Sequence, residues 1–317
     1  FNVHEVPLQY NNFLKKIFFL YRLIKNKKYH IIHSWSFYAN PIAVLLSYLC
    51  KINLCIGSAR NNYQSYKKNL SWFHRFISIK LPNYILVNSY KFQQSLIDNG
   101  ASLEKIIYLP NCLDSKLLSI NKTIELKNLY KNINSKDLII GIVANLKWEK
   151  NHKMFIKSIK EISRKHNNVK AVIIGQEIKD QESILDEIKN LISSNNLEQK
   201  INILGYKKNI YDYLKSFKIL CLTSDSEGLP NVIIESMAIG TPVISTNVGD
   251  ISKIINHGED GYIVQKNDYK NMTFFIDILL KDESVYNKVA FNGVEKVIKL
   301  FKPANAKSIL EKVYNCL

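Results

Sequence analysis

Apolar runs of strand length alternate with stretches of helical periodicity along this chain, and this alternation constrains the fold more than any other feature of the sequence. Such a pattern is typical of α/β proteins with parallel sheets. Most of the runs are continuously apolar, which predicts strands that helices cover on both faces. The expected strands are His30–Ser34, Asn53–Ser58, Tyr84–Asn88, Lys105–Leu109, Leu138–Ala144, Val169–Gly175, Ile201–Leu204, Ile219–Thr223, Pro242–Thr246 and Gly261–Val264.

The length of 317 residues suits two domains of ordinary size. Helical periodicity is clear at Phe13–Ile24 and Tyr90–Asn99, and Lys302-Pro303 is a start signal for a last helix, Ala304–Leu317. The strand and helix pattern begins again after the polar stretch Tyr130–Lys136. We therefore expect an N-terminal domain at 1–133, a second domain at 134–301, and a C-terminal helix at 302–317 that packs back on the first domain.

The formal net charge of +17 indicates nucleic acid, an anionic membrane surface or anionic small molecules as partners. Basic residues occur along the whole chain without a nucleic-acid motif, so we expect no nucleic-acid partner. Five scattered cysteines form no CxxC pair or zinc-like cluster, which indicates a reducing, cytoplasmic compartment. The longest apolar run, near Pro41–Cys50, is shorter than the about 20 residues that span a bilayer.

The segment from Ser224 to Val232 carries the residues best suited to chemistry. It follows an expected strand, and ligands of open α/β sheets bind at the carboxyl ends of strands. Gly228-Leu229-Pro230 is a turn signal, Pro230 suits the first position of a helix, and the N–H groups of the first helical turn can bind a phosphate. Glu227 stands before the expected helix and Glu235 about two turns into it, so both carboxylates can border one cleft and bind hydroxyl groups of a ribose or a sugar.

The stretch from Ser224 through Glu227 and Glu235 to Ile244 resembles the signature of the retaining family 4 glycosyltransferases, the glycosyl transferases group 1, and the likeness continues through Thr246–Gly249 and Gly258–Val264. The resemblance implies a GT-B fold, in which two Rossmann-like domains with parallel sheets face each other across a cleft. It implies that Glu227 contacts the transferred sugar and that Glu235 holds the ribose hydroxyls. The segment formed by Gly228, Leu229, Pro230, Asn231 and Val232 would contact the donor sugar and phosphate through its backbone N–H groups, which Pro230 lacks.

A second group of donor-binding candidates follows from the same resemblance. Relatives place a basic pair after the strand that matches Leu138–Ala144; Lys150 matches its second member, whereas Asn145 stands where the first is usually Arg. Lys147 is close enough in sequence to supply the missing charge. Gly175 matches a strand-end glycine, and Leu204-Gly205 matches the turn whose backbone contacts the nucleotide base.

On the acceptor side, the resemblance implies that His33, at a strand end, approaches the donor sugar as a catalytic residue, and that Arg60 and Asn61 bind the acceptor. Arg60 is equally well explained as one half of a structural ion pair. The turn from Pro110 to Asp114 matches a structural motif of the family, with Cys112 in place of glycine. Basic and aromatic residues alternate at 15–28 and at 66–76, so these stretches could rest on an anionic membrane surface; ordinary amphipathic helices in a lysine-rich chain explain them as well.

These features together predict a metal-independent, retaining hexosyl- or N-acetylhexosaminyltransferase. It would use a nucleotide-sugar, UDP-sugar rather than GDP-sugar, as co-substrate without a further cofactor. Its acceptor would be a glycan or a lipid-linked sugar of capsule or lipopolysaccharide synthesis at the inner face of the cytoplasmic membrane. Two alternatives remain: a non-catalytic nucleotide-sugar-binding protein and a nucleotide-sugar 2-epimerase. Asp225-Ser226-Glu227 is a poor candidate for a metal site, because two carboxylates alone rarely hold Mg²⁺.

Relatives of this kind begin with a strand and a glycine-rich loop, whereas this chain opens at Phe1-Asn2-Val3. We therefore expect that an N-terminal segment is lacking. Because strands of the first sheet would then lie unpaired at an edge, we expect weak or no activity from the 317 residues alone.

Overall fold

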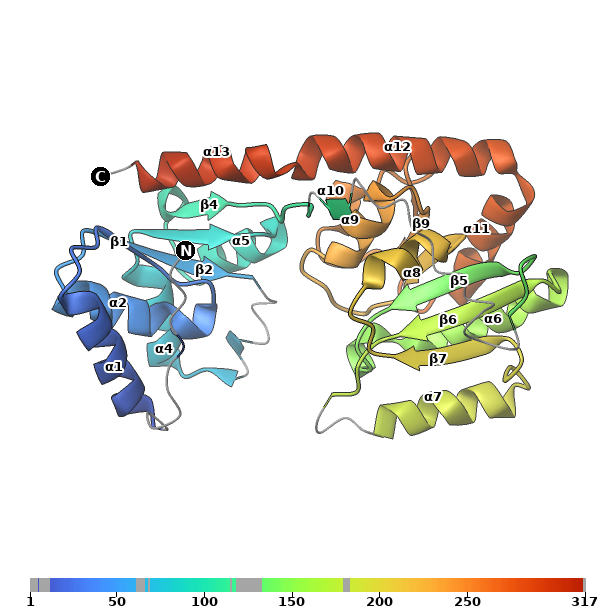
Figure 1. Cartoon of the computed structure of the whole chain (residues 1–317), viewed down its shortest axis with the longest axis horizontal. Coiled ribbons are helices and arrows are strands. Elements are labelled where there is room, and N and C mark those ends of the chain that lie inside the picture. Colours follow the sequence, from blue (N-terminus) through green and yellow to red (C-terminus); the bar gives the residue numbers. More distant parts are fainter. Residues whose placement is uncertain are drawn as a thin grey trace. The chain divides into compact units, whose positions relative to one another are not determined.

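The computed structural model describes residues 5, 12–60, 66–67, 69–114, 116–117, 133–178 and 183–315. It divides into two units: unit 1 comprises Phe1–Pro110 and Lys307–Leu317, and unit 2 comprises Asn111–Ala306. Each unit contains its own parallel sheet flanked by helices (Figure 1), which confirms the predicted α/β class with two Rossmann-like domains. The boundary expected at 133–134 stays a prediction, because residues 118–132 beside it lie outside the described residues.

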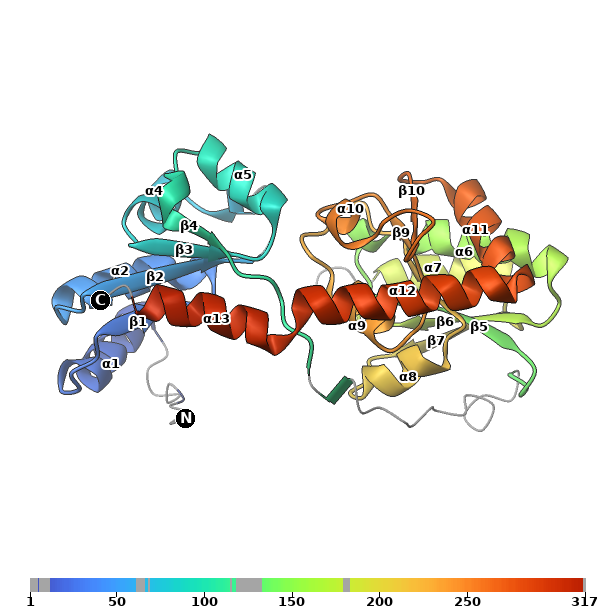
Figure 2. The same ribbon diagram turned by 90° about the horizontal axis from the view of Figure 1, so that it is seen from above.

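Unit 1 contains a four-stranded parallel sheet in the order β1-β2-β3-β4, which can be followed in Figure 2. Its core lies around Phe37, Tyr66, Ile85 and Leu96. The elements are α1 (Phe13–Lys25), β1 (Ile31–His33), η1 (Phe37–Ala39), α2 (Asn40–Leu49), β2 (Leu54–Ala59), α4 (Trp72–Lys80), β3 (Tyr84–Val87), α5 (Tyr90–Asp98), η2 (Leu103–Lys105) and β4 (Ile106–Tyr108). The last helix of the chain, α13 (Pro303–Tyr314), ends among the residues of this unit.

Unit 2 contains a six-stranded parallel sheet in the order β10-β9-β8-β5-β6-β7. Read from β7, this is the strand order of a doubly wound dinucleotide-binding fold, with a reversal between β5 and β8. The elements are β5 (Leu138–Val143), η5 (Trp148–Lys150), α6 (His152–Lys165), β6 (Val169–Ile174), α7 (Ser183–Ser194), β7 (Ile201–Gly205), α8 (Ile210–Ser216), β8 (Ile219–Leu222), α9 (Asn231–Ala238), β9 (Val243–Thr246), α10 (Ile251–Ile254), β10 (Tyr262–Val264), α11 (Tyr269–Lys281) and α12 (Glu283–Phe301).

Helices cover both faces of the sheet of unit 2, as the continuously apolar strands predict. Ile140 and Ile142 of β5 pack with α6, α7 and α11, whereas Ile139 on the opposite face packs with α8, α9 and α12. Gly141 makes room for a ring, because a Cβ built there would lie 2.0 Å from Phe217. Both faces of β5 are therefore filled, and only the ends of the strand remain for ligands.

Every expected strand is present, and each strand end lies within one residue of the expected position. The last helix begins at Pro303, inside the expected start signal Lys302-Pro303 and one residue before the expected first residue, Ala304. One expectation needs correction: α9 begins at Asn231, so Pro230 precedes the helix and Glu235 is its fifth residue, not two turns inside it. No helix in the described part of the chain is long and apolar enough to cross a bilayer.

Candidate functional site

The strand order of unit 2 reverses between β5 and β8, and such a reversal leaves a crevice at the carboxyl ends of the two strands. The loop after β5 leads to Lys150, and the loop after β8 leads to Glu227. The two segments that the sequence singled out for donor binding therefore leave the sheet side by side.

Lys150 and Glu227 form the centre of this site. The Lys150 Nζ donates to Glu227 Oε1 at 2.5 Å, and the two side chains are only 19% and 12% exposed. Ser224 Oγ donates to the same carboxylate oxygen at 2.6 Å. Charge-assisted hydrogen bonds in a half-buried setting are strong, so the pair holds both loops in one geometry.

Backbone contacts hold the two loops together as well. The N–H of Asp225 donates to the Glu149 carbonyl at 2.7 Å, and Thr223 Oγ1 donates to the Lys150 carbonyl at 2.9 Å. The Asp225 carboxylate accepts from Asn151 Nδ2 at 3.2 Å, so the two carboxylates of Asp225-Ser226-Glu227 contact different partners. Among the described residues, no group of three or more His, Cys, Asp or Glu side chains has the geometry of a metal site.

Gly249, in the loop after the strand β9, supports the Glu227–Gly228 turn. Its φ of +57° lies in the left-handed region, and a Cβ built on it would lie 2.2 Å from the Gly228 carbonyl oxygen. The N–H of Asp250 donates to that oxygen at 3.0 Å. Only glycine allows this close backbone approach, which explains the residue type in the Thr246–Gly249 segment.

Glu235 is half-buried on α9, and burial, followed by the nearby Asp114 carboxylate, raises its pKa. Burial, Glu235 and Asp114 also raise the pKa of Tyr211. The turn Gly228 to Val232 leads into α9; Leu229 and Pro230 are buried, and Asn231 and Val232 begin the helix.

A segment predicted to be structural reaches this same site. Asn111 Nδ2 donates to the side-chain oxygen of Asn231 and, at 3.4 Å, to the Leu229 carbonyl. With Asp114 near Glu235, Asn111 and Asp114 thus border the donor-binding candidates of unit 2. The sequence contains no signal for this contact, because it joins residues about 120 positions apart.

Asn145 and Lys147 are placed differently from Lys150. Asn145 Oδ1 accepts the N–H of Gln176 at 3.3 Å, so its side chain joins the ends of β5 and β6. The Lys147 Nζ lies 3.7 Å from Glu149 Oε1, where both side chains are partly exposed. Whether either residue binds the donor stays a prediction.

Gly175, Leu204 and Gly205 lie at the ends of β6 and β7. A Cβ on Gly175 would lie 1.8 Å from the Ala144 carbonyl oxygen, and the Gly175 N–H donates to the Gly205 carbonyl at 3.1 Å. Gly205 has a φ of +64° with open space around it, whereas Leu204 is buried. The two glycines are therefore required by the backbone, and their roles toward a nucleotide stay predictions.

His152 is a neighbour of Lys150 to which the sequence analysis assigned no role. It is only 3% exposed at the start of α6, and its Nε2 has no hydrogen-bond partner among the described residues. Burial lowers the pKa of His152 to about 4. A hydrogen bond to the Ala144 backbone partly opposes this effect, and the charge of Lys150 adds to it. At neutral pH the His152 imidazole is therefore neutral, and it lies near enough to Lys150 for the lysine charge to contribute to this lowered pKa.

In unit 1, His33 is held on both ring nitrogens. Its Nδ1 lies 2.9 Å from the hydroxyl of Tyr314 on α13, and its Nε2 lies 3.1 Å from Ser58 Oγ. The ring stacks on Trp35 at a centroid distance of 4.7 Å, and the Arg60 guanidinium lies 4.5 Å from the Trp35 ring centroid. The structure thus places His33 and Arg60 around one aromatic ring, and Asn61 lies outside the described residues.

Burial and the Arg60 charge lower the pKa of His33 to about 4, whereas a free histidine titrates near 6.5. As the pH falls from 6.5 toward 4, the unfolded chain binds a proton that folded His33 does not, so the free energy of unfolding falls in that window. Above it, His33 adds no pH dependence. NMR titration of the ring, assigned with His33→Gln, tests the pKa directly. Thermal unfolding of His33→Gln should show a shallower loss of stability on acidification, and an equal or steeper loss would contradict the expectation.

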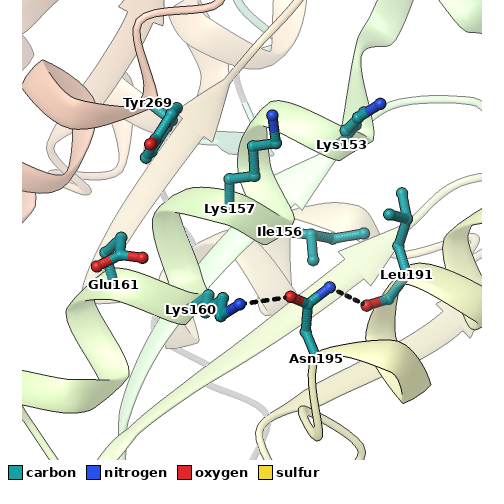
Figure 3. Close-up of a pocket in the computed structure, with 8 residues that line it drawn as sticks. All are labelled: Lys153, Ile156, Lys157, Lys160, Glu161, Leu191, Asn195 and Tyr269. Carbon is teal, nitrogen blue, oxygen red and sulfur yellow. Dashed lines mark hydrogen bonds between the residues drawn. The ribbon is translucent and has the colours of Figure 1, made fainter.

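A separate cavity of about 200 Å³ lies among α6, α7 and α11, and contains none of the residues predicted from the sequence (Figure 3). Lys160 Nζ donates to Asn195 Oδ1 at 2.7 Å, and Lys157 Nζ lies 5.5 Å from the Tyr269 ring centroid. Lys153 also lines the cavity. Glu161, the glutamate that lines the cavity, pairs with Arg164. The three lysines of the cavity therefore have no carboxylate partner among the described residues.

Comparison with known proteins places this geometry in a family context. Residues 127–296 match the family model described as Glycosyl transferases group 1. The capsular polysaccharide biosynthesis glycosyltransferase CapM of Staphylococcus aureus is 25% identical and aligns over 98% of this chain and 84% of its own length. The UDP-Gal:alpha-D-GlcNAc-diphosphoundecaprenol alpha-1,3-galactosyltransferase of Escherichia coli is 24% identical over 95% of this chain and 79% of its own.

Solved structures share the fold. Anabaena Alr3699/HepE in complex with UDP superposes with a TM-score of 0.84 at 17% identity, over 95% of this chain and 82% of that one. A glycosyltransferase from Rickettsia africae superposes with a TM-score of 0.79 at 22% identity, over 94% of this chain and 80% of that one.

Proposed function

Because this chain belongs to the glycosyl transferases group 1, we propose that it transfers a hexosyl or N-acetylhexosaminyl group from a UDP-sugar to a glycan or lipid-linked acceptor. The reaction would serve the synthesis of a bacterial cell-surface polysaccharide such as a capsule. The CapM relative acts, by its name, in capsular polysaccharide synthesis, and the Escherichia coli relative acts on a diphosphoundecaprenol-linked acceptor. The UDP bound to the Anabaena neighbour is the reason to prefer a uridine donor.

The single observation that carries the proposal is the contact between Lys150 and Glu227. These residues lie 77 positions apart in the sequence, and both belong to motifs that resemble the donor site of this family. A lysine ammonium has three donors, so Lys150 can hold the Glu227 carboxylate and still donate to a diphosphate oxygen. Negative charge grows on the leaving diphosphate as the sugar is transferred, and a fixed cation stabilises that charge.

The remaining donor contacts follow from the same site. The first turn of α9 leaves backbone N–H groups without partners inside the helix, and its dipole favours an anion there. Glu227 would orient the sugar, and Glu235 would accept hydrogen bonds from the ribose hydroxyls. The raised pKa of Glu235 suits a carboxylate that is partly removed from water and gains stabilisation from bound hydroxyl groups.

We infer that the reaction retains the anomeric configuration without a metal ion. The acceptor would attack on the face from which the diphosphate leaves, and a phosphate oxygen would take the acceptor proton. Lys150 stays bound to the diphosphate through this step. His33 would contact the donor sugar only if the sugar displaces Ser58 or Tyr314 from a ring nitrogen, since both nitrogens are engaged.

Transfer of labelled sugar tests the proposal. The protein is incubated with labelled UDP- and GDP-sugars and a lipid extract that contains polyprenyl diphosphate sugars, and the products are separated by chromatography. We expect transfer from a UDP-sugar and its loss in Glu227→Ala. Glu198→Ala is the matched control, because Glu198 is exposed at the turn before β7.

Three outcomes would change the assignment. UDP binding without turnover on any acceptor would favour a non-catalytic nucleotide-sugar-binding protein. Conversion of the donor without an acceptor would favour an epimerase. If neither UDP nor GDP raises the unfolding temperature, the assignment of a donor site is wrong, because a ligand that binds only the folded state must stabilise the folded state.

A further inference from the structure

Unit 1 has a charge pattern unlike the rest of the chain. Between Glu5 and Asp98 the sequence contains thirteen lysines and arginines and no aspartate or glutamate, whereas the whole chain has 44 basic and 27 acidic residues. A region without carboxylates cannot neutralise its cations internally. Its positive potential is therefore available to an anionic partner.

Three neighbouring helices of unit 1 expose apolar side chains, and two of them, α1 and α4, also carry cations. Helix α2 packs against both α1 and α4, and Figure 1 shows all three below the strands of that unit. Ten of the twenty large apolar residues that are exposed in the described part of the chain lie on these helices or directly after α4. They are Phe13, Leu14, Phe18, Leu45, Tyr48, Leu49, Trp72, Phe73, Phe76 and Leu81.

On each helix the exposed apolar residues recur at helical spacing. Leu14 and Phe18 of α1 share a face with Arg22 and Lys25, because they are spaced by four, four and three residues. On α4, Trp72 and Phe76 stack at a centroid distance of 5.3 Å. Helices α1 and α4 thus present an apolar strip with cations beside it, which is the pattern of helices that lie in a membrane interface. Helix α2, which lies between them, adds the exposed apolar residues Leu45, Tyr48 and Leu49 without a cation.

A small hollow of about 100 Å³ lies beside α4. Lys67, Arg75 and Lys80 supply its cations, and Trp72 and Phe76 supply its aromatic rings. The Lys80 ammonium donates to the Gly100 carbonyl, and Arg75 Nη1 donates to the Lys67 carbonyl at 3.1 Å. Both groups have further donors for an oxyanion, so the hollow suits the phosphate of a lipid headgroup.

We propose that α1, α2 and α4 form a membrane-binding surface that docks on an anionic phospholipid bilayer, with the aromatic and leucine side chains inserted and the lysines and arginines on lipid phosphates. A second copy of this chain is a poor occupant, because two faces without carboxylates repel each other. Nucleic acid is a poorer match than lipid, because Leu14, Leu45 and Leu49 are aliphatic and cannot stack on bases.

Vesicle co-sedimentation tests this surface, and it needs neither donor nor acceptor, so its result is independent of sugar transfer. The wild-type protein should bind vesicles of phosphatidylglycerol with phosphatidylcholine and bind vesicles of phosphatidylcholine alone much more weakly. A triple variant of α1, Lys15→Gln, Lys16→Gln and Lys25→Gln, should lose about a hundredfold in partition coefficient, since each cation near an anionic surface contributes about 1 kcal/mol. The matched control, Lys153→Gln, Lys157→Gln and Lys189→Gln in unit 2, removes the same charge and should bind as the wild type does.

Insertion is tested by a second pair of variants. Trp72→Ser with Phe73→Ser should weaken vesicle binding, whereas Phe274→Ser with Phe291→Ser, which removes two equally exposed rings of unit 2, should not. Equal losses in both charge variants would show a non-specific effect of net charge and overturn the proposal. The proposal would also be overturned if the protein bound single-stranded RNA through the α1 lysines but did not bind vesicles. A dimer in sedimentation equilibrium that the Trp72 and Phe73 substitutions dissociate would overturn it as well.

Discussion

Sugar transfer by the Lys150→Met variant is expected to fall about a hundred- to a thousandfold, the loss seen when one preorganised donor to a developing negative charge is removed. Methionine keeps most of the length of the side chain but cannot donate to Glu227 or to a diphosphate. The half-buried Glu227 carboxylate then keeps Ser224 as a partner and loses its cation. Initial rates at saturating UDP-sugar give the effect on kcat, and calorimetry with UDP gives the effect on affinity.

Lys153→Met is the control for this experiment. Lys153 lies three residues after Lys150 at the start of α6, is exposed and lines the cavity of Figure 3. We expect its kcat to equal that of the wild type. A double-mutant cycle with Glu227→Gln should show strong non-additivity, because the two side chains share one contact. Retention of full activity in Lys150→Met would remove the diphosphate role and leave the pair a structural contact.

Gly249→Ala is expected to damage the donor site through the backbone alone. Two costs add here: alanine at a φ of +57° costs about 1–2 kcal/mol, and forcing a methyl group into close-packed atoms typically costs about 1–3 kcal/mol. The clashing atoms are the carbonyls of Gly228 and Glu227, so the turn must move away from β9. We expect a lower unfolding temperature and a loss of UDP affinity together.

Gly258→Ala separates the two costs. Gly258 has a φ of +81° with open space around its Cα, so alanine there carries the conformational cost without the clash. Its unfolding temperature should fall by only a few degrees, at roughly 2–4 °C per kcal/mol for a domain of this size, with UDP affinity unchanged. If Gly249→Ala binds UDP as well as Gly258→Ala does, the turn does not need its present position for donor binding.

The fold was largely predictable because the signals for it are local. A run such as Leu138–Val143 is apolar throughout and has the length of a strand, which is typical of a strand buried on both faces. Helix ends were less predictable: Pro230 is a helix-start residue by type, yet α9 begins one residue later. The donor segment was found because Glu227, Gly228 and Glu235 lie within nine residues of one another in a motif that resembles a known family.

The sequence by itself determined the α/β class, the strands and the two loops that carry Lys150 and Glu227, because each of these depends on neighbours along the chain. Only the tertiary structure decided which distant residues meet. Lys150 reaches Glu227 because β5 and β8 are adjacent at the point where the strand order reverses, and Tyr314 reaches His33 across 281 positions. Asn145 binds the backbone of Gln176, and Asn111 binds Asn231, for the same reason. These contacts depend on the packing of whole elements, and no local pattern of residue types contains that information.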